Sequence, residues 1–247
     1  MTAVRSRYTR LLVNQFDFSG ISNALEVAYE VERVDTTAFQ DTGSTSMALS
    51  TAATITQNGY FQNAAAGEFE QEIWESIQNA ETLYVAALFG TDTPACSAHV
   101  ARATTTGKLN IKAEVEGLIS VGGEWFQGVG ALAGRRVWAG TVSATGAQTT
   151  PGYIDLGAAG AAGGYVWLFV QSITGTATNA AINVQSDDNT GFSSPATEAT
   201  FTFSAVGGYE QAMSGAVDRY LRLNVTSLGG ATNFTVVAIA AVGGITY

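Results

Sequence analysis

Hydrophobic and polar residues alternate cleanly over residues 25–33 of this 247-residue chain. The odd-numbered positions hold Leu25, Val27, Tyr29 and Val31, whereas glutamates occupy positions 26, 30 and 32. A period of two residues places the two sets on opposite faces of a β-strand. The pattern therefore predicts a strand with one buried face and one acidic, solvated face.

The next two patterns predict a second strand and one helix. Residues 50–61 form the strand, which we expect to end at the turn dipeptide Asn58-Gly59. Residues 68–79 predict the helix, because Phe69, Ile73 and Ile77 recur every four residues and form an apolar stripe, with Trp74 beside them.

The rest of the first half predicts more β-structure. Residues 82–89 form an apolar strand, and residues 108–115 alternate again, with the apolar side chains inward and Lys108, Lys112 and Glu114 outward. The pair Gly122-Gly123 predicts a turn or a bulge. A helix among strands makes the first half an α+β domain that is mainly β.

The second half of the chain is almost entirely strand pattern. Apolar or alternating runs with turn residues between them cover residues 165–173, 181–185, 198–203, 220–225 and 234–241. This spacing predicts a β-sandwich or jelly roll. Small and polar residues between 138 and 150 separate the halves, so we expect one β-sandwich domain over residues 1–140 and a second over residues 150–247.

Charge argues against tight binding of nucleic acid. The chain has 11 Lys and Arg residues against 21 Asp and Glu residues, a net charge of −10. Proteins that bind DNA tightly release counterions from phosphate through basic patches. An acidic wall would instead repel phosphate and let DNA slide past, although acidity also simply keeps a protein soluble.

No apolar stretch is long enough for a membrane anchor or a secretory leader. The longest runs from Phe234 to Ile245, about 12 residues, whereas a spanning helix needs ~20. The run Leu11–Val13 is too short for a signal-peptide core. We therefore expect a protein made in the cytoplasm, in which the single Cys96 forms no intrachain disulfide.

Candidate catalytic and metal-binding residues are scarce. His99 is the only histidine and lies in a strand-like segment, so one His and one Cys cannot supply a structural zinc site. The segment Asp187–Gly191 has the composition of a calcium loop, but its glycine comes one position early and no bidentate Glu follows, which favours a β-turn. We predict no enzyme activity and no cofactor.

The segment from Val13 to Thr42 resembles the tail tube proteins of long-tailed bacteriophages. The resemblance is carried first by the opening Asn14, Asp17, Ser19 and Gly20. A second group of matching residues stands at the start of the long loop that follows the predicted strand: Val34, Asp35, Thr37, Phe39, Asp41 and Thr42. Gln15 departs from the family, which often has Gly at that position. The resemblance covers roughly residues 8–140, and the second half resembles an appended phage β-sandwich domain more loosely.

The resemblance implies a structural virion protein that forms stacked rings, usually of six subunits, around a conduit for DNA. Its partners would be further copies of itself and other tail proteins, such as the tape measure and the tail terminator. DNA would pass without specific binding. We expect the acidic strand faces to line the lumen or to lie between subunits: Glu26, Glu30, Glu32, Glu114 and Glu116. The loop over residues 35–46 would contact the next ring through Asp35, Thr37, Phe39, Asp41 and Thr42.

A second hypothesis is a carbohydrate- or cell-surface-binding module. Trp125, Trp138, Tyr153, Trp167 and Tyr220 could form a platform for a sugar, although most of them lie in apolar strand patterns that predict a core position.

Overall fold

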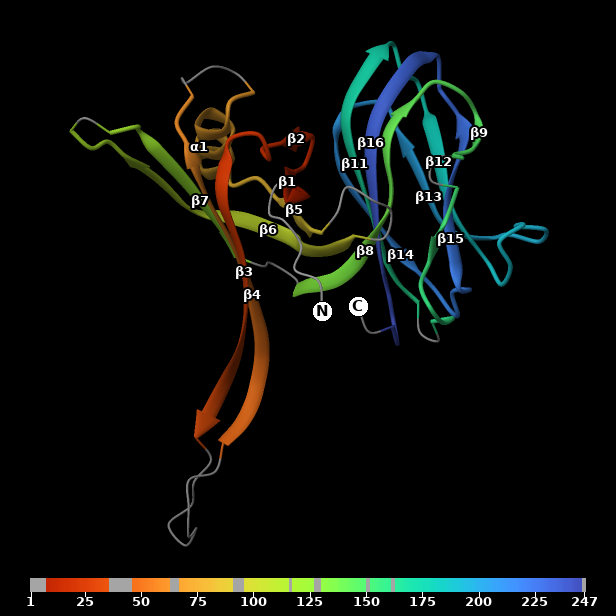
Figure 1. Ribbon diagram of the computed structural model, residues 1–247, viewed down its shortest axis with the longest axis horizontal. Helices are drawn as coiled ribbons and strands as arrows, with labels where there is room; N and C mark the ends of the chain where they lie inside the picture. The colour runs from red at the N-terminus through yellow and green to blue at the C-terminus, as the bar shows by residue number, and fades with distance from the viewer. Residues whose placement is uncertain are drawn as a thin grey trace, which may run out of the picture. The chain divides into compact units, whose positions relative to one another are not determined.

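The structure is a computed structural model that describes residues 8–35, 46–62, 67–90, 96–115, 117–126, 130–149, 152–160 and 163–245; within strands, the side chains of residues 31–35, 46–52 and 130 are outside that description. This part of the chain is mainly β, with one short helix and antiparallel sheets (Figure 1). The predicted fold class is confirmed. None of the described helical structure is long and apolar enough to cross a membrane.

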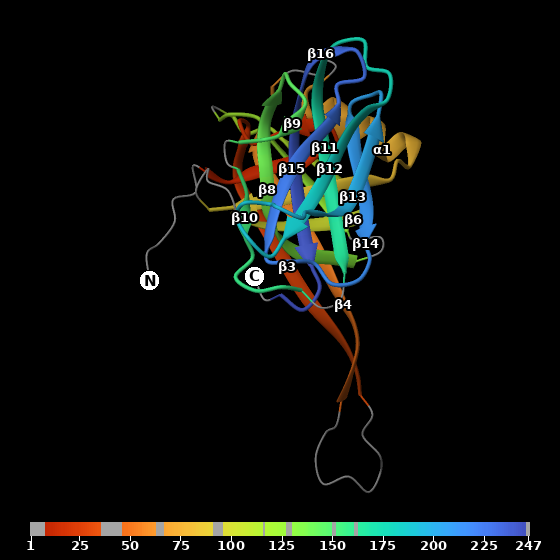
Figure 2. The same ribbon diagram turned by 90° about the vertical axis from the view of Figure 1, so that its right-hand side faces the viewer.

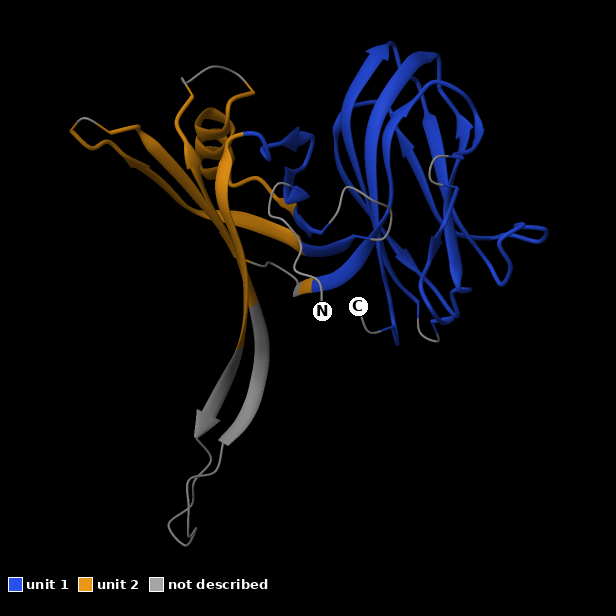
Figure 3. Cartoon of the chain, viewed as in Figure 1, with its two compact units in different colours: residues 1–20, 86–100, 132–247 blue, residues 21–85, 101–131 orange. Residues whose placement is uncertain are grey.

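Two compact units divide the chain, and each is assembled from separate segments (Figure 3). Unit 1 holds residues 1–20, 86–100 and 132–247, and unit 2 holds residues 21–85 and 101–131. The predicted boundary near residues 140–150 falls inside unit 1. The division into a tube domain and an outer domain stays a prediction.

Unit 2 is a four-stranded antiparallel sheet with a helix. The strand order is β3-β4-β7-β6. Its elements are β3 (Ser22–Asp35), β4 (Ser46–Tyr60), α1 (Phe69–Asn79), β7 (Ser120–Phe126) and the second part of β6 (Ser97–Lys112). The helix ends at Ala80, which adopts a left-handed conformation and donates its backbone N–H to Ile77. The predicted helix and the strands over residues 25–33 and 82–89 are confirmed.

The second half forms a jelly roll within unit 1 (Figure 2). One sheet has the order β8-β16-β11-β14 and the other the order β10-β15-β12-β13, with β9 also paired to β15. This is the order of two intertwined Greek keys. The strands are β8 (Gly130–Val142), β9 (Gly146–Ala147), β10 (Ile154–Asp155), β11 (Gly164–Gly175), β12 (Ala180–Asp187), β13 (Ala196–Phe203), β14 (Gly207–Met213), β15 (Tyr220–Ser227) and β16 (Ala231–Val242).

The core of the jelly roll lies between its two sheets. Inward residues of both sheets are buried, among them Val184, Phe201, Leu223 and Phe234. Beyond β8, the first sheet continues through β6 and β5 (Leu83–Phe89) to the short strands β1 (Arg10–Val13) and β2 (Phe16–Asp17). The sandwich predicted for the second half is thus confirmed, and β8 and β14 are strands that the sequence patterns missed.

Two glycine-containing dipeptides, one predicted as a turn and the other as a turn or a bulge, lie inside paired strands, so those predictions are wrong. Asn58 and Gly59 pair with both β3 and β7. Gly122 and Gly123 continue the β4–β7 register without a shift. Packing explains these glycines: a Cβ on Gly59 would lie 2.3 Å from the carbonyl oxygen of Ile21. A bulge does occur nearby, between Thr106 and Lys108 of β6.

Candidate functional site

The sheet of unit 2 has two chemically different faces, which its registers define. Val27 pairs with Ile55, and Ile55 pairs with Trp125, so these three residues share one face. This face carries α1, because the Phe69 ring meets the Trp125 ring edge-on with centroids 6.1 Å apart. Phe69, Trp125 and Ile55 are at most 1% exposed. The two central strands, β4 and β7, therefore bury this face under the helix.

The opposite face is polar, and it is exposed along both edge strands and half-buried at Thr56 and Glu124. Glu26 pairs with Thr56, Thr56 with Glu124, and Glu124 with Lys108, so these four side chains share it. Glu30 lies on the same face, and both Glu26 and Glu30 are exposed. The predicted acidic, solvated face of β3 is thus confirmed at these two glutamates.

The predicted buried face of β3 is only partly buried. Leu25 and Val27 are half-buried, and Tyr29 is 42% exposed. The reason is that β3 is an edge strand, paired only with β4 in the described sheet. Its apolar side chains therefore pack against a neighbouring strand on one side only, and their other side stays exposed.

Two other predicted site residues, Glu114 and Asp35, lie at or beyond the end of a strand. β6 ends at Lys112, so Glu114 lies in the exposed β6–β7 connection, and Val115, expected to face inward, is 97% exposed. Asp35 pairs with Ser46 at the end of the β3–β4 hairpin. The side chains of Glu32 and Asp35, and the whole of Thr37, Phe39, Asp41, Thr42 and Glu116, lie outside the described residues.

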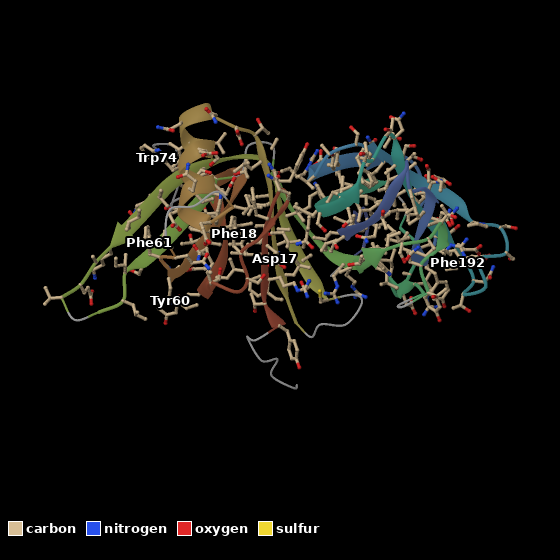
Figure 4. The ribbon with its side chains drawn as sticks, turned by 90° about the horizontal axis from the view of Figure 1, so that it is seen from above. Asp17, Phe18, Tyr60, Phe61, Trp74 and Phe192 are labelled. Atoms are coloured by element: carbon tan, nitrogen blue, oxygen red, sulfur yellow. The ribbon has the colours of Figure 1, made fainter. Side chains whose placement is uncertain are left out.

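The second edge of the unit 2 sheet is the Thr105–Lys112 part of β6, which pairs with β7. A groove of about 710 Å³ runs beside it, between this strand and α1. Its lining is mainly apolar and includes Phe61, Trp74, Ile77 and Leu109. Trp74 projects from α1 and is 49% exposed (Figure 4). A strand edge and an apolar groove thus lie next to each other.

A second candidate site is an aromatic and arginine cluster on the outer face of the β10-β15-β12-β13 sheet. The Arg222 guanidinium lies 4.3 Å from the centroid of the Phe192 ring, and its Nε donates to Gln185 Oε1 at 2.9 Å. The Tyr153 ring, 40% exposed, lies 6.3 Å from Phe192 and 5.5 Å from Tyr220. Three rings therefore form one continuous cluster.

An ion pair holds the other end of this cluster. Arg219 lies 5.1 Å from the Tyr220 ring centroid and donates to both carboxylate oxygens of Asp155 at 2.7 Å. These hydrogen bonds hold the pKa of Asp155 at about 2, well below the ordinary value. The aromatic rings are thus flanked by two guanidinium groups with fixed partners.

The loop that presents Phe192 is tightly hydrogen-bonded. Asp187 accepts the backbone N–H of Asn189 and of Ser194, each at 3.0 Å, and Asn189 accepts that of Gly191. Phe192 itself has a φ of 48°, which is unfavourable for a large side chain. The turn predicted at Asp187–Gly191 is confirmed. Figure 4 shows Phe192 among the side chains of the jelly roll.

Aromatic residues that were candidates for a sugar platform divide into two groups. Trp125, Trp138 and Trp167 are buried, as their apolar strand patterns predicted. Tyr153 is exposed and Tyr220 is half-buried. The sequence missed Phe192, Arg219 and Arg222, because Phe192 lies in a loop and only the fold brings them together.

The predicted strand position of His99 is confirmed. It lies in β6, its ring is 5.8 Å from that of Phe89, and burial lowers its pKa. Among the described residues, no three His, Cys, Asp or Glu side chains are grouped so that they could hold a metal ion.

No family model and no curated protein matches the sequence. Solved structures do match its fold. The virion of a native gene transfer agent particle is 14% identical, with a TM-score of 0.39, over 52% of this chain and 97% of that chain. The SPP1 tail tube is 11% identical, with a TM-score of 0.41, over 53% and 78%.

A third match extends over nearly the whole chain. The SPP1 Dit protein, described as a hub adsorption apparatus of phages that infect Gram-positive bacteria, is 10% identical, with a TM-score of 0.34. The match covers 94% of this chain and 98% of that chain. The three matched chains thus come from a gene transfer agent virion, a phage tail tube and a phage adsorption apparatus, each with a TM-score below 0.5.

Proposed function

We propose that this protein is a structural subunit of a phage tail tube, copies of which close into a ring. The observation that carries the proposal is the unit 2 sheet, which ends in β3 at one edge and in the second part of β6 at the other. Exposed strand edges promote association of a monomer with other chains. Joining the β6 edge of each copy to the β3 edge of the next removes both of these edges in a closed ring.

The two faces of the sheet support an inside and an outside for this ring. The face under α1 is apolar and already covered, whereas the Glu26 and Glu30 face is exposed and polar. In a ring, the exposed face would line the channel. Carboxylates there would repel DNA phosphates and keep the conduit from binding its cargo. No catalytic chemistry is required for this role.

The resemblance of residues 13–43 to tail tube proteins supports further features of this ring. The ring would contain six subunits and would stack into a tube in the virion tail, with the tape measure inside and a terminator at its end. The β3–β4 hairpin connection, with Thr37, Phe39, Asp41 and Thr42, would contact the next ring. The jelly roll would lie on the outside of the tube.

Electron microscopy of the purified full chain tests the proposal. We expect closed rings or tubes, with a matching increase in mass in analytical ultracentrifugation as concentration rises. A chain that stays monomeric at all accessible concentrations, in low and physiological salt, would overturn the proposed function. A ring whose channel is lined by the jelly roll would overturn it as well.

A second function, binding of a neutral saccharide, is favoured by the aromatic and arginine cluster of the jelly roll. The exposed Tyr153 ring offers a face on which a sugar ring can stack, and Arg222 and Gln185 offer groups that bind hydroxyls. Arg219 is paired with Asp155, and Asp187 and Asp188 lie at the start of the loop that presents Phe192, which makes the surface unsuitable for a polyanion.

Tyr153→Ala is expected to weaken saccharide binding about tenfold, the loss of ~1.4 kcal/mol of ring contact. Calorimetric titration with neutral oligosaccharides of glucose, galactose, rhamnose and N-acetylglucosamine measures it. Tyr60→Ala, which removes a comparably exposed ring in unit 2, is the matched control. Equal affinities in the two variants, or no binding by the unaltered chain, would exclude this function for the cluster.

A further inference from the structure

The two edges of the unit 2 sheet carry opposite charges with the same spacing on the same face. Glu26 and Glu30 are four residues apart on β3, and Lys108 and Lys112 are four residues apart on β6. The registers place Glu26 and Lys108 on one face, through Thr56 and Glu124. Because Lys112 also lies an even number of residues from Lys108, it shares that face. All four side chains are exposed.

Strand directions fix how two copies can meet. Each neighbouring pair in the order β3-β4-β7-β6 is antiparallel, so β6 runs opposite to β3. When a second copy is added head to tail, its β3 therefore lies antiparallel to β6 of the first copy. In that arrangement Glu30 falls opposite Lys108 when Glu26 falls opposite Lys112. Opposite charges on directly facing strand residues stabilise the pair, and like charges destabilise it.

We propose that β3 of one copy binds the β6 edge of the next in this single register, with Glu26 opposite Lys112 and Glu30 opposite Lys108. The inference rests on the proposed ring and names the contact that closes it. Lys112 lies 2.5 Å from Glu114 in the single chain, but both side chains are more than 60% exposed. Such an exposed ion pair is weak, so Lys112 can exchange it for Glu26 of the partner.

The helix-facing side of the same register is also complementary. Pairing of Glu26 with Lys112 places Val27 opposite Ile111 and Tyr29 opposite Leu109. Ile111 and Leu109 line the groove beside α1, together with Trp74 and Ile77. Tyr29 is 42% exposed and Ile111 is 55% exposed in the single chain. The incoming strand would therefore fill an apolar groove on one face while it pairs charges on the other.

Charge exchange between the two edges tests the register. The variant with Lys108→Glu and Lys112→Glu should require at least about tenfold more protein to form rings, and so should the variant with Glu26→Lys and Glu30→Lys. An equimolar mixture of the two variants should restore assembly, because each copy then meets a neighbour of opposite edge charge. The variant that carries all four substitutions should also assemble.

A variant with Glu75→Lys and Glu81→Lys is the control, since it reverses two exposed charges of unit 2 that lie on α1 and directly after it, not on either edge strand. Ring formation is followed by sedimentation velocity and electron microscopy, with circular dichroism to verify folding. If the unaltered chain forms rings and both edge variants form them equally well, the register is overturned and the proposed function stands. The same holds if the unaltered chain forms rings but the mixture of variants stays monomeric. An unaltered chain without rings would overturn both.

Discussion

Trp125→Ala is expected to lower the free energy of unfolding of unit 2 by about 3–5 kcal/mol. Trp125 is fully buried and packs edge-on against Phe69, the first residue of α1. It also shares the helix-facing side of the sheet with Ile55. Its loss would leave a cavity at the contact between helix and sheet. Urea unfolding followed by circular dichroism measures the change.

Trp74→Ala is the matched control for this prediction. It removes the same side chain from the same unit, but at a position that is 49% exposed. We expect a loss below about 1 kcal/mol. Similar losses in the two variants would show that α1 is not held to the sheet by Trp125.

Gly59→Val is expected to lower the free energy of unfolding by about 1–3 kcal/mol, the usual cost of overpacking. Strand propensity alone predicts the opposite sign, because valine favours strands and glycine does not. A Cβ at this position would, however, lie 2.3 Å from the carbonyl oxygen of Ile21. That oxygen accepts the backbone N–H of Tyr60 at 3.2 Å, so it cannot move without loss of a hydrogen bond.

Gly20→Val serves as the reference for Gly59→Val in the same unfolding assay. No atom lies within 4 Å of the position of its Cβ, so we expect a change within about 0.5 kcal/mol. A Gly59→Val variant that is as stable as the unaltered chain would show that β3 and β4 can separate at this point without cost.

Periodicity predicted the elements of this fold where a single residue spacing dominates. The alternation over residues 25–33 and the four-residue spacing of Phe69, Ile73 and Ile77 both correspond to observed elements, β3 and α1. The predictions failed where a local preference competed with packing. Asn58-Gly59 favours a turn, but Gly59 is small because another backbone segment passes close to it.

The candidate sites could be predicted only in part. The sequence indicated the exposed position of Glu26 and Glu30, since alternation alone decides which face a strand residue occupies. It could not show that β3 and Lys108 lie at opposite edges of one sheet, because no local pattern predicts the strand order β3-β4-β7-β6. The Phe192 and Arg222 contact likewise joins a loop to a strand 30 residues later.

The position of β16 has a consequence for synthesis of the protein. β16 is the last strand of the jelly roll to leave the ribosome, yet it lies between β8 and β11 in the sheet. At about 5–20 residues per second, translation from Gly175, the end of β11, to Ala231 takes roughly 3–11 s. During that interval the nascent chain exposes the apolar strand β11 without its central neighbour, and a chaperone that recognises such segments would have time to bind it.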